Sequence, residues 1–325
     1  MAETFYNQIS ANKRNSFLLT LIIVILFALL GFSIGYAFGG DIASALVVMA
    51  ITIGVGAAIG AASYFKGDSV VLAVSGAREV DATSAPQLMN VIQELAIAAN
   101  TPMPKVYVID DTAPNAFATG RDPRHASVAI TTGLLQKLDR EELQGVMGHE
   151  LSHVRNFDIR FAMIVGVLVG SIALLADFFL RFTFWGGMRR SRGDREGGAG
   201  GLQAIMFVVA LVLAILAPIA SRLVQLAINR QREYLADASA VGLTRNPYGL
   251  ERALAKISAD TEVLEAANRA TQHMYFTNPI KKFEERASGL FSTHPATVDR
   301  INRLRELTGE RPLDSAEAAQ LAGLD

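Results

Sequence analysis

Two long uncharged stretches near the N-terminus constrain the fold of this chain more than any other feature. Positions 15–40 and 42–65 contain no charged side chain, and one residue, Asp41, separates them. Each stretch exceeds the roughly 20 apolar residues that a helix needs to cross the hydrocarbon core of a bilayer. The first is also too long for the core of a cleaved secretory signal. The sequence therefore predicts an N-terminal transmembrane hairpin of two helices over residues 1–65.

Two further apolar runs cover positions 161–180 and 202–220. The first contains one charge, Asp177, and the second contains none. The segment between them, 185–201, is rich in Gly and Arg, which is typical of a flexible loop. We therefore expect a second hydrophobic hairpin over residues 161–221, with two segments that enter the membrane.

The basic residues around the first hairpin predict its orientation. Lys13 and Arg14 precede the first apolar run and Lys66 follows the second, whereas the link between the runs carries only Asp41. The positive-inside rule places such basic flanks in the cytoplasm. Residues 66–160 are therefore expected on the cytoplasmic side of the membrane.

The second hairpin leaves two orientations open. The stretch 181–201 that connects the runs carries five arginines, which argues against export, and Asp177 would cost up to about 2.5–3.5 kcal/mol at the bilayer centre. That cost is smaller near the end of the run, where Asp177 lies. The two runs either cross the bilayer or dip into it from the cytoplasmic side. The long uncharged run 202–220 favours two crossings.

Composition excludes several classes of partner and site. The net charge is −1, so no polyanionic partner such as a nucleic acid is expected. The chain has no cysteine, which excludes disulfides and thiolate metal sites. Any metal must therefore be bound by the five histidines or by carboxylates.

The polar residues form two blocks, 66–160 and 222–325, and their patterning predicts a mainly α fold with a small β-sheet. Alternating and β-branched runs indicate four strands, and capping signals and 3.6-residue periodicity indicate the helices. The expected strands lie at 70–80, 105–110, 115–120 and 125–133, and the expected helices at 84–100, with a capping box at Ser84 and Gln87, 139–154, 222–241, 248–260 and 295–307.

The sequence GHELSHVRN, residues 148–156, is the strongest chemical signal. Asp139 and Glu142 form a capping box that predicts a helix through this stretch. His149 and His153 then lie four residues apart on one helical face and can bind one Zn²⁺ together. Glu150 is placed to accept a proton from a water that the metal activates. This H-E-x-x-H pattern is typical of zinc peptidases; the alternative is an amphipathic helix with incidental histidines.

A third protein ligand is needed, and the segment NRQREYLADASA offers one. Glu233 and Asp237 are four residues apart and share a helical face. We expect Glu233 to complete a His₂Glu set and Asp237 to accept a hydrogen bond from the free ring N–H of a ligand histidine, with His149 as the first candidate. If the helix of His153 continues to residue 161, the metal lies about 12 Å along that helix from the apolar run.

The motifs HELSH, EYLAD, NAFATG and STHP, in this order behind a membrane hairpin, resemble the HtpX family of membrane-bound zinc endopeptidases, which is related to the CAAX prenyl endoproteases. The resemblance covers nearly the whole chain. It implies a gluzincin-type catalytic domain on a transmembrane helical anchor, formed by residues 66–160 and 222–325, with one Zn²⁺ per chain. It also implies cleavage of misfolded or damaged membrane proteins at the cytoplasmic side, in stress response and protein quality control.

Two motifs gain a role from this resemblance. NAFATG would be an edge strand beside the metal, at which Asn115, Ala116 and Phe117 bind an extended substrate through main-chain hydrogen bonds; an ordinary strand is the alternative. In STHPATVDR, His294 and Arg300 match the H-P-x-x-x-x-R pattern of the related endoproteases. They would stabilise the oxyanion or bind substrate. The alternative makes this segment a helix N-terminus, with Pro295 at its first position and Arg300 on the solvated face.

Two other functional classes compete with a membrane endopeptidase. One is a catalytically silent chaperone or adaptor that binds zinc only for stability, and Glu150 argues against it because a structural site needs no base. The other is a metal transporter, which would place ionisable residues inside the apolar runs, where only Asp177 is found. The sequence predicts neither the oligomeric state nor the cleavage preference.

Overall fold

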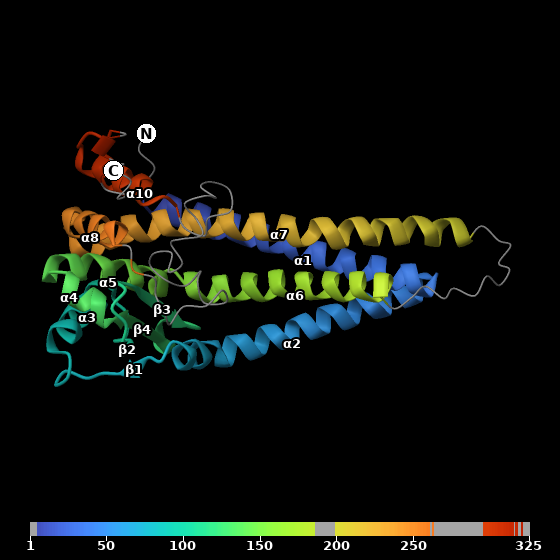
Figure 1. Ribbon diagram of the computed structural model, residues 1–325, viewed down its shortest axis with the longest axis horizontal. Helices are drawn as coiled ribbons and strands as arrows, with labels where there is room; N and C mark the ends of the chain where they lie inside the picture. Colours follow the sequence, from blue (N-terminus) through green and yellow to red (C-terminus); the bar gives the residue numbers. More distant parts are fainter. Residues whose placement is uncertain are drawn as a thin grey trace. The chain divides into compact units, whose positions relative to one another are not determined.

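The computed structural model describes residues 5–185, 199–260, 262, 295–314, 316–317 and 320. The chain divides into two compact units, each of which combines segments that are distant in sequence (Figure 1). The helix unit comprises Lys13–Tyr64 and Ala162–Ile228. The sheet unit comprises Met1–Asn12, Phe65–Phe161 and Asn229–Asp325.

Four long helices supply the helix unit: α1 (Phe5–Gly39), α2 (Ile42–Val74), α6 (Asp158–Trp185) and α7 (Ala199–Thr244). Each contains a segment long and apolar enough to cross a membrane, with mean hydropathy between 1.9 and 2.7. The four apolar runs predicted from the sequence are therefore confirmed as helices of membrane-spanning length. The predicted helix at 222–241 is the C-terminal part of α7, which is continuous with the fourth run.

Small residues let α1 and α2 approach closely within the helix unit. A Cβ added at Gly35 would lie 2.8 Å from the Cα of Ala45, and one at Gly31 would lie 2.4 Å from the hydroxyl of Thr52. The link between the helices turns at Gly40, whose φ of 77° favours glycine. Asp41 then begins α2 by accepting hydrogen bonds from the backbone N–H and the hydroxyl of Ser44. The short link therefore holds the two helices as a hairpin.

Aromatic contacts join α1, α6 and α7 in the same unit. The ring of Phe38 lies 5.9 Å from that of Phe179 and 5.3 Å from that of Phe182, and Phe179 lies 6.0 Å from Phe207. These edge-to-face and tilted ring pairs pack the helices where hydrophobic burial against lipid provides little net driving force.

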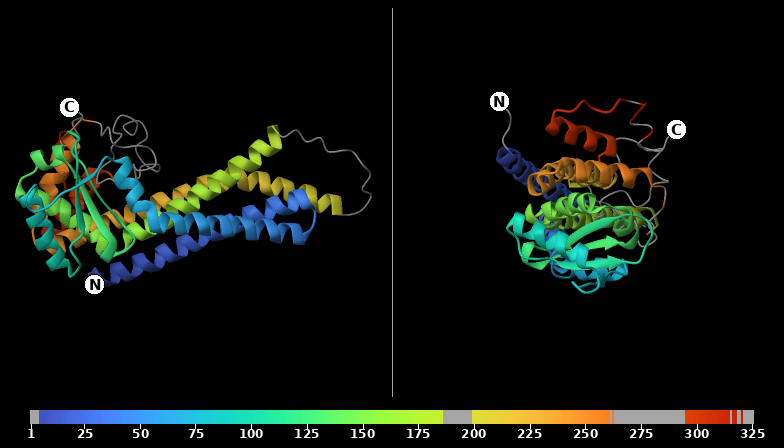
Figure 2. Two further views of the ribbon diagram at one scale, coloured as in Figure 1. Left: turned by 90° about the horizontal axis from the view of Figure 1, so that it is seen from below. Right: turned by 90° about the vertical axis from the view of Figure 1, so that its left-hand side faces the viewer.

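One mixed four-stranded sheet (Figure 2) forms the β part of the sheet unit. Its strand order is β1-β2-β4-β3. Its strands are β1 (Arg78–Glu79), β2 (Lys105–Ile109), β3 (Ala116–Gly120) and β4 (Ala126–Thr131). β2 pairs with β4 in parallel, and the two outer pairs are antiparallel. The fold class predicted from the sequence, mainly α with a small sheet, is confirmed.

The strand predicted at 70–80 is wrong over most of its length. Helix α2 continues to Val74, and only Arg78 and Glu79 pair with β2. The apolar residues that suggested a strand instead bring Leu72 against one face of the sheet, in a small core with Ile109, Phe117 and Ala129. Tertiary packing therefore overrides the β-propensity of this stretch.

The opposite face of the sheet packs in the main core. Ala116 and Ala118 of β3 and Val128 and Ile130 of β4 point there, because alternate residues of a strand face opposite sides. Helices α3 (Pro86–Ala99), α5 (Arg140–Arg155), α8 (Pro247–Ala259) and α10 (Thr297–Thr308) contribute most of the other side chains of this core. α5 therefore runs beside the edge strand β3.

The capping predictions had mixed outcomes. Asp139 and Glu142 form the expected reciprocal capping box at the start of α5. The box predicted for α3 is wrong: Ala85 is the N-cap, and the hydroxyl of Ser84 bonds with Asp81 instead. Helix α10 begins at Thr297, two residues after the predicted start at Pro295.

Two glycines allow α5 and α8 to meet at backbone distance. A Cβ added at Gly145 would lie 2.6 Å from the backbone nitrogen of Leu250, and one at Gly249 would lie 2.5 Å from the carbonyl oxygen of Glu141. Both neighbouring atoms belong to the main chain and cannot move aside cheaply. This contact fixes α5, the helix that carries the H-E-x-x-H motif.

We expect Gly145→Ala to lower the free energy of unfolding by about 1–3 kcal/mol, because the added methyl group overpacks this contact. The matched control is Gly242→Ala, also inside a helix, where no described atom outside its own stretch of helix lies within 4 Å of the added Cβ. Its higher helix propensity should stabilise the protein by about 0.5–1 kcal/mol. Denaturant unfolding of the detergent-solubilised chain measures both; equal effects of the two substitutions would contradict the packing account.

Candidate metal centre

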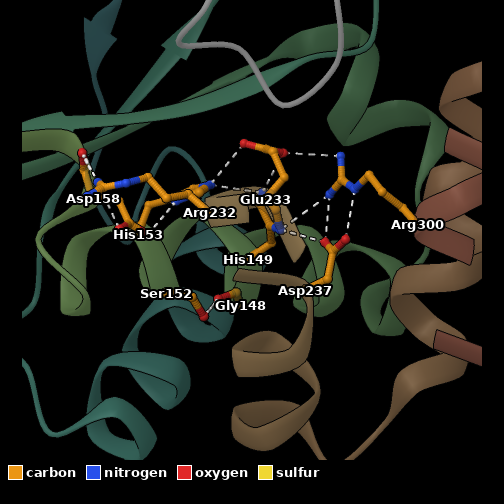
Figure 3. A network of polar contacts seen from close by, with 9 residues as sticks. All are labelled: Gly148, His149, Ser152, His153, Asp158, Arg232, Glu233, Asp237 and Arg300. Carbon is orange, nitrogen blue, oxygen red and sulfur yellow. Dashed lines mark hydrogen bonds and ion pairs between the residues drawn. The ribbon is translucent and has the colours of Figure 1, made fainter. Parts of the chain in front are cut away.

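Three potential ligands converge between α5 and α7 (Figure 3). His149 and His153 lie on one face of α5, and Glu233 faces them from α7. The two Nε2 atoms are 3.1 Å apart, and the carboxylate oxygens of Glu233 lie 3.6 Å from Nε2 of His149 and 3.5 Å from Nε2 of His153. Ligand atoms that surround one Zn²⁺ tetrahedrally lie roughly 3.3–3.6 Å apart. The donor set and its spacing therefore fit a zinc ion.

Asp237 orients the ring of His149. Its Oδ1 lies 2.8 Å from Nδ1 of His149, so that Nε2 is directed toward Glu233. Both groups are buried, with 1% and 3% of the residue surface exposed. A carboxylate in this position fixes the tautomer of a ligand histidine and makes the ring more basic. The structure places Asp237 where the sequence predicted it.

Arg300 is the buried counter-ion of this carboxylate. Its Nε donates to Oδ2 of Asp237 at 2.9 Å and its Nη2 to Oδ1 at 2.7 Å, while Nη1 lies 3.5 Å from Glu233. The residue is 2% exposed, so the alternative that placed it on a solvated helix face is wrong. A two-pronged ion pair of this kind is geometrically specific. Arg300 thus contacts the carboxylate behind His149.

His153 has a comparable pair of partners that the sequence reading missed. Its Nδ1 lies 3.1 Å from Oδ2 of Asp158, and Oδ1 of Asp158 accepts from Nη1 of Arg232 at 2.9 Å. Asp158 follows His153 by five residues, which is not a spacing that shares a face on a continuous helix. Only a break in the helix after α5 brings the two side chains together. The sequence signal available for this break was Asn156, which follows the last turn of α5.

The buried charges of the centre are unbalanced by two. Among the residues whose side-chain burial the structure describes, and apart from Glu142, which pairs with Lys256, those with buried charge are four carboxylates and two guanidiniums. The carboxylates are Glu150, Asp158, Glu233 and Asp237, and the guanidiniums are Arg232 and Arg300. With neutral imidazoles the cluster carries −2. A bound divalent cation would make it neutral, which buried charge strongly favours.

The histidines respond to the same excess of negative charge. Burial by itself lowers the pKa of His153, but Asp158 and Glu233 outweigh it and raise that pKa to about 10. Burial and Arg300 oppose protonation of His149, yet Asp237 and Glu233 raise its pKa above the ordinary value. Protons and metal ions compete for imidazole nitrogens. Both shifts therefore express a demand for positive charge at the Nε2 atoms.

Glu150 is buried beside the three ligands without being one of them. It follows His149 on α5 and is 2% exposed. Burial raises the pKa of its carboxyl group, although the neighbouring histidines act in the opposite direction. A carboxylate with raised proton affinity is a better general base near neutral pH.

The predicted substrate strand β3 lies at the edge of the sheet. The side chains of Asn115, Ala116 and Phe117 are buried, and Phe117 points to the face of the sheet away from the main core. The backbone N–H of Ala116 donates to Oδ1 of Asn115 at 3.0 Å. Contact with a substrate would therefore use the main chain, and pairing at Ala116 requires release of this local hydrogen bond. The substrate role of these residues stays a prediction.

Of two other histidines, one lies outside the described residues, and the other belongs to no candidate metal cluster among them. His294, the predicted oxyanion stabiliser, lies outside the described residues. Nδ1 of His125 lies 2.9 Å from Oδ1 of Asp122 at the surface. His149, His153 and Glu233 form the group of candidate ligands that the described part of the chain brings together.

Comparison with known proteins agrees with this geometry. Residues 82–308 match the model of peptidase family M48. The protease HtpX homologue of Ligilactobacillus salivarius (strain UCC118) is 43% identical over 302 residues, which cover 93% of this chain and 99% of the relative. The homologue of Streptococcus pneumoniae (strain Hungary19A-6) is 44% identical over 304 residues, with the same coverage. No solved structure matches the chain.

We expect Glu233→Ala to lose zinc at neutral pH, because two imidazoles remain to bind the ion and one negative charge has been removed. The metal content of the detergent-purified protein is measured by mass spectrometry. Glu306→Ala, which removes an exposed carboxylate from α10, is the control and should keep the wild-type content. Unchanged zinc in the Glu233 variant would exclude its role as a ligand.

Proposed function

The chain belongs to peptidase family M48, among the HtpX homologues, and from this we propose that it is a membrane-bound zinc endopeptidase that cleaves misfolded or damaged membrane proteins. The observation that supports the proposal most directly is the convergence of His149, His153 and Glu233 around one point, with the buried carboxylate of Glu150 next to them. A peptidase needs both parts, a metal site and a base.

Each buried group has a distinct task in this proposal. His149, His153 and Glu233 would hold one Zn²⁺. The ion would supply Lewis acidity, which would polarise the scissile carbonyl and lower the pKa of a water to about 7. Glu150 accepts the proton of the attacking water and delivers it to the departing amine. Asp237 and Arg300 keep the ring of His149 in position throughout.

A catalytically silent chaperone or adaptor is the competing function. Such a protein would bind zinc for stability alone and would have no use for a buried, unligated carboxylate at position 150. Burial of Glu150 carries an energetic cost, and a structural site would gain nothing in return. This cost favours the peptidase.

Substrate selection follows from β3. An edge strand recognises an extended peptide mainly through its backbone, which tolerates many side-chain sequences. Such selection suits damaged or unfolded segments of proteins better than one defined substrate. A role in stress response and protein quality control at the bacterial inner membrane is the corresponding biological proposal, and His294 remains a proposed oxyanion stabiliser on sequence grounds.

For orientation we propose that the active site faces the cytoplasm and that α6 and α7 both cross the bilayer. The charge of Asp177 opposes membrane crossing less than an unpaired carboxylate would. It accepts a hydrogen bond from Nε of Arg181 at 2.7 Å, one helical turn away. Paired charges near the end of a span cost less than isolated charges at its centre.

We expect Glu150→Gln to keep one zinc per chain and to lose cleavage of a denatured membrane substrate by at least about 10²-fold, because the amide cannot accept the proton. Metal analysis and a gel-based cleavage assay on the same preparation measure the two properties. Glu141→Gln, the same substitution at an exposed position in the first turn of the same helix, is the control and should keep both zinc and cleavage. Proteolysis at the wild-type rate by the Glu150 variant would remove the assigned base.

The absence of cysteine allows a clean test of topology. A cysteine at Ser191 should react with an impermeant thiol reagent from the periplasmic side, because two crossings place the segment between α6 and α7 outside. A cysteine at Ala82, an exposed position after β1, should react only from the cytoplasm. Labelling of the Ser191 position from the cytoplasm alone would instead support a hairpin that dips into the membrane.

A further inference from the structure

His153 has a support of its own, distinct from the pair behind His149. Asp158 is 5% exposed and directs Oδ2 to Nδ1 of His153 at 3.1 Å. Arg232, itself 7% exposed, donates through Nη1 to Oδ1 and to the backbone carbonyl of Asp158, both at 2.9 Å. In Figure 3, Asp158 and Arg300 lie on opposite sides of the three ligands. The two histidines are thus held from opposite sides by separate carboxylates.

A costly backbone turn makes the contact of Asp158 with His153 possible. Helix α5 ends at Arg155 and α6 begins at Asp158, with Phe157 between them at a φ of 59°. On an unbroken helix Asp158 would lie roughly 140° around the axis from His153, out of reach. A bulky side chain rarely adopts positive φ. The turn ends the helix of His153 before residue 161, and it brings the carboxylate to the ring.

Arg232 links this support to the third ligand. It immediately precedes Glu233 on α7, whereas Asp158 is the first residue of α6. Nη1 of Arg232 therefore connects the first turn of α6 to α7, at the position next to Glu233. The support behind His149 has a different origin, because Asp237 comes from α7 and Arg300 from α10.

We propose that Asp158 and Arg232 are positioning residues that hold His153 as a zinc ligand and thereby set the affinity of the centre. Asp158 accepts the Nδ1–H of His153 and leaves the Nε2 lone pair for the ion; Arg232 keeps the carboxylate in place and offsets its charge. Loss of a partner of this type typically costs 10–100-fold in metal affinity. The inference rests on the proposed zinc peptidase function and adds to it the basis of ligand orientation.

The test measures zinc binding by the full chain in detergent micelles, by competition with a chromophoric chelator. The Glu150→Gln background prevents self-cleavage without removing a ligand. Asp158→Asn should weaken zinc binding by about 10–100-fold. Asp299→Asn, the same substitution at an exposed first-turn position of α10, is the matched control and should leave affinity unchanged. A shift of less than twofold for Asp158→Asn would overturn the inference.

A second variant separates positioning from folding. Asp158→Asn leaves the charge of Arg232 buried, so the double variant Asp158→Asn/Arg232→Met removes the pair together, which is often neutral for stability. The double variant should unfold at the same temperature as its parent without metal and still bind zinc about 10–100-fold more weakly. Parent-like affinity in the folded double variant would contradict the proposal.

The absorption spectrum of Co²⁺-loaded protein gives a readout that a purely structural role would not move. Release of His153 from the ion should shift and weaken the visible bands of the tetrahedral cobalt site in both Asp158 variants. Unchanged bands in both would contradict the inference. If the parent chain binds no zinc at all, both the proposed function and this inference fail. If parent and variants bind zinc equally well, only the role of Asp158 and Arg232 is excluded.

Discussion

The centre depends on one electrostatic constraint: a cluster of buried carboxylates carries two more negative charges than its guanidiniums neutralise. Four carboxylates and two arginines are removed from solvent around two imidazoles. Buried charge of this kind is tolerated only when it is paired. The raised pKa values of both histidines show that the cluster attracts positive charge. A divalent cation would supply that charge at the point on which the donor atoms of His149, His153 and Glu233 converge.

The fold meets this constraint with residues that are far apart in the sequence. The two histidines come from a helix with a capping box at its start, and a glycine contact with α8 fixes that helix. The third ligand and two supporting residues come from α7, some eighty positions later. The final guanidinium comes from α10. Each histidine is thereby oriented by a carboxylate, and each of these carboxylates is held by an arginine.

Sequence reading predicted the parts of this arrangement that follow from regular spacing. Helical spacing of four relates His149 to His153 and Glu233 to Asp237, and the structure places all four together. Uncharged runs likewise predicted the four long apolar helices. The need for a third ligand and the spacing of Glu233 and Asp237 indicated which distant carboxylate faces the histidines, and the matching relatives confirm the resemblance to the HtpX family.

An irregular backbone conformation and packing between distant segments explain what could not be predicted from the sequence. Asp158 reaches His153 only because Phe157 adopts a left-handed conformation, which no periodic pattern encodes. Arg300 matches a solvated helical position in sequence, and its burial depends on Asp237 from another helix. The apolar residues before β1 have β-propensity but extend α2, because Leu72 packs against the sheet. These outcomes required information on packing between distant segments.

X-ray absorption spectroscopy of the zinc-loaded chain tests the central claim most directly. We predict an edge and fine structure for one zinc ion bound by two imidazole nitrogens and by oxygen ligands, all at about 2.0–2.2 Å. Replacement of either His149 or His153 by alanine leaves two protein ligands and should, like the loss of Glu233, remove stoichiometric zinc at neutral pH. Absence of stoichiometric zinc from the wild-type chain, or a wild-type spectrum that requires only one imidazole, would contradict a centre built on these two histidines and Glu233.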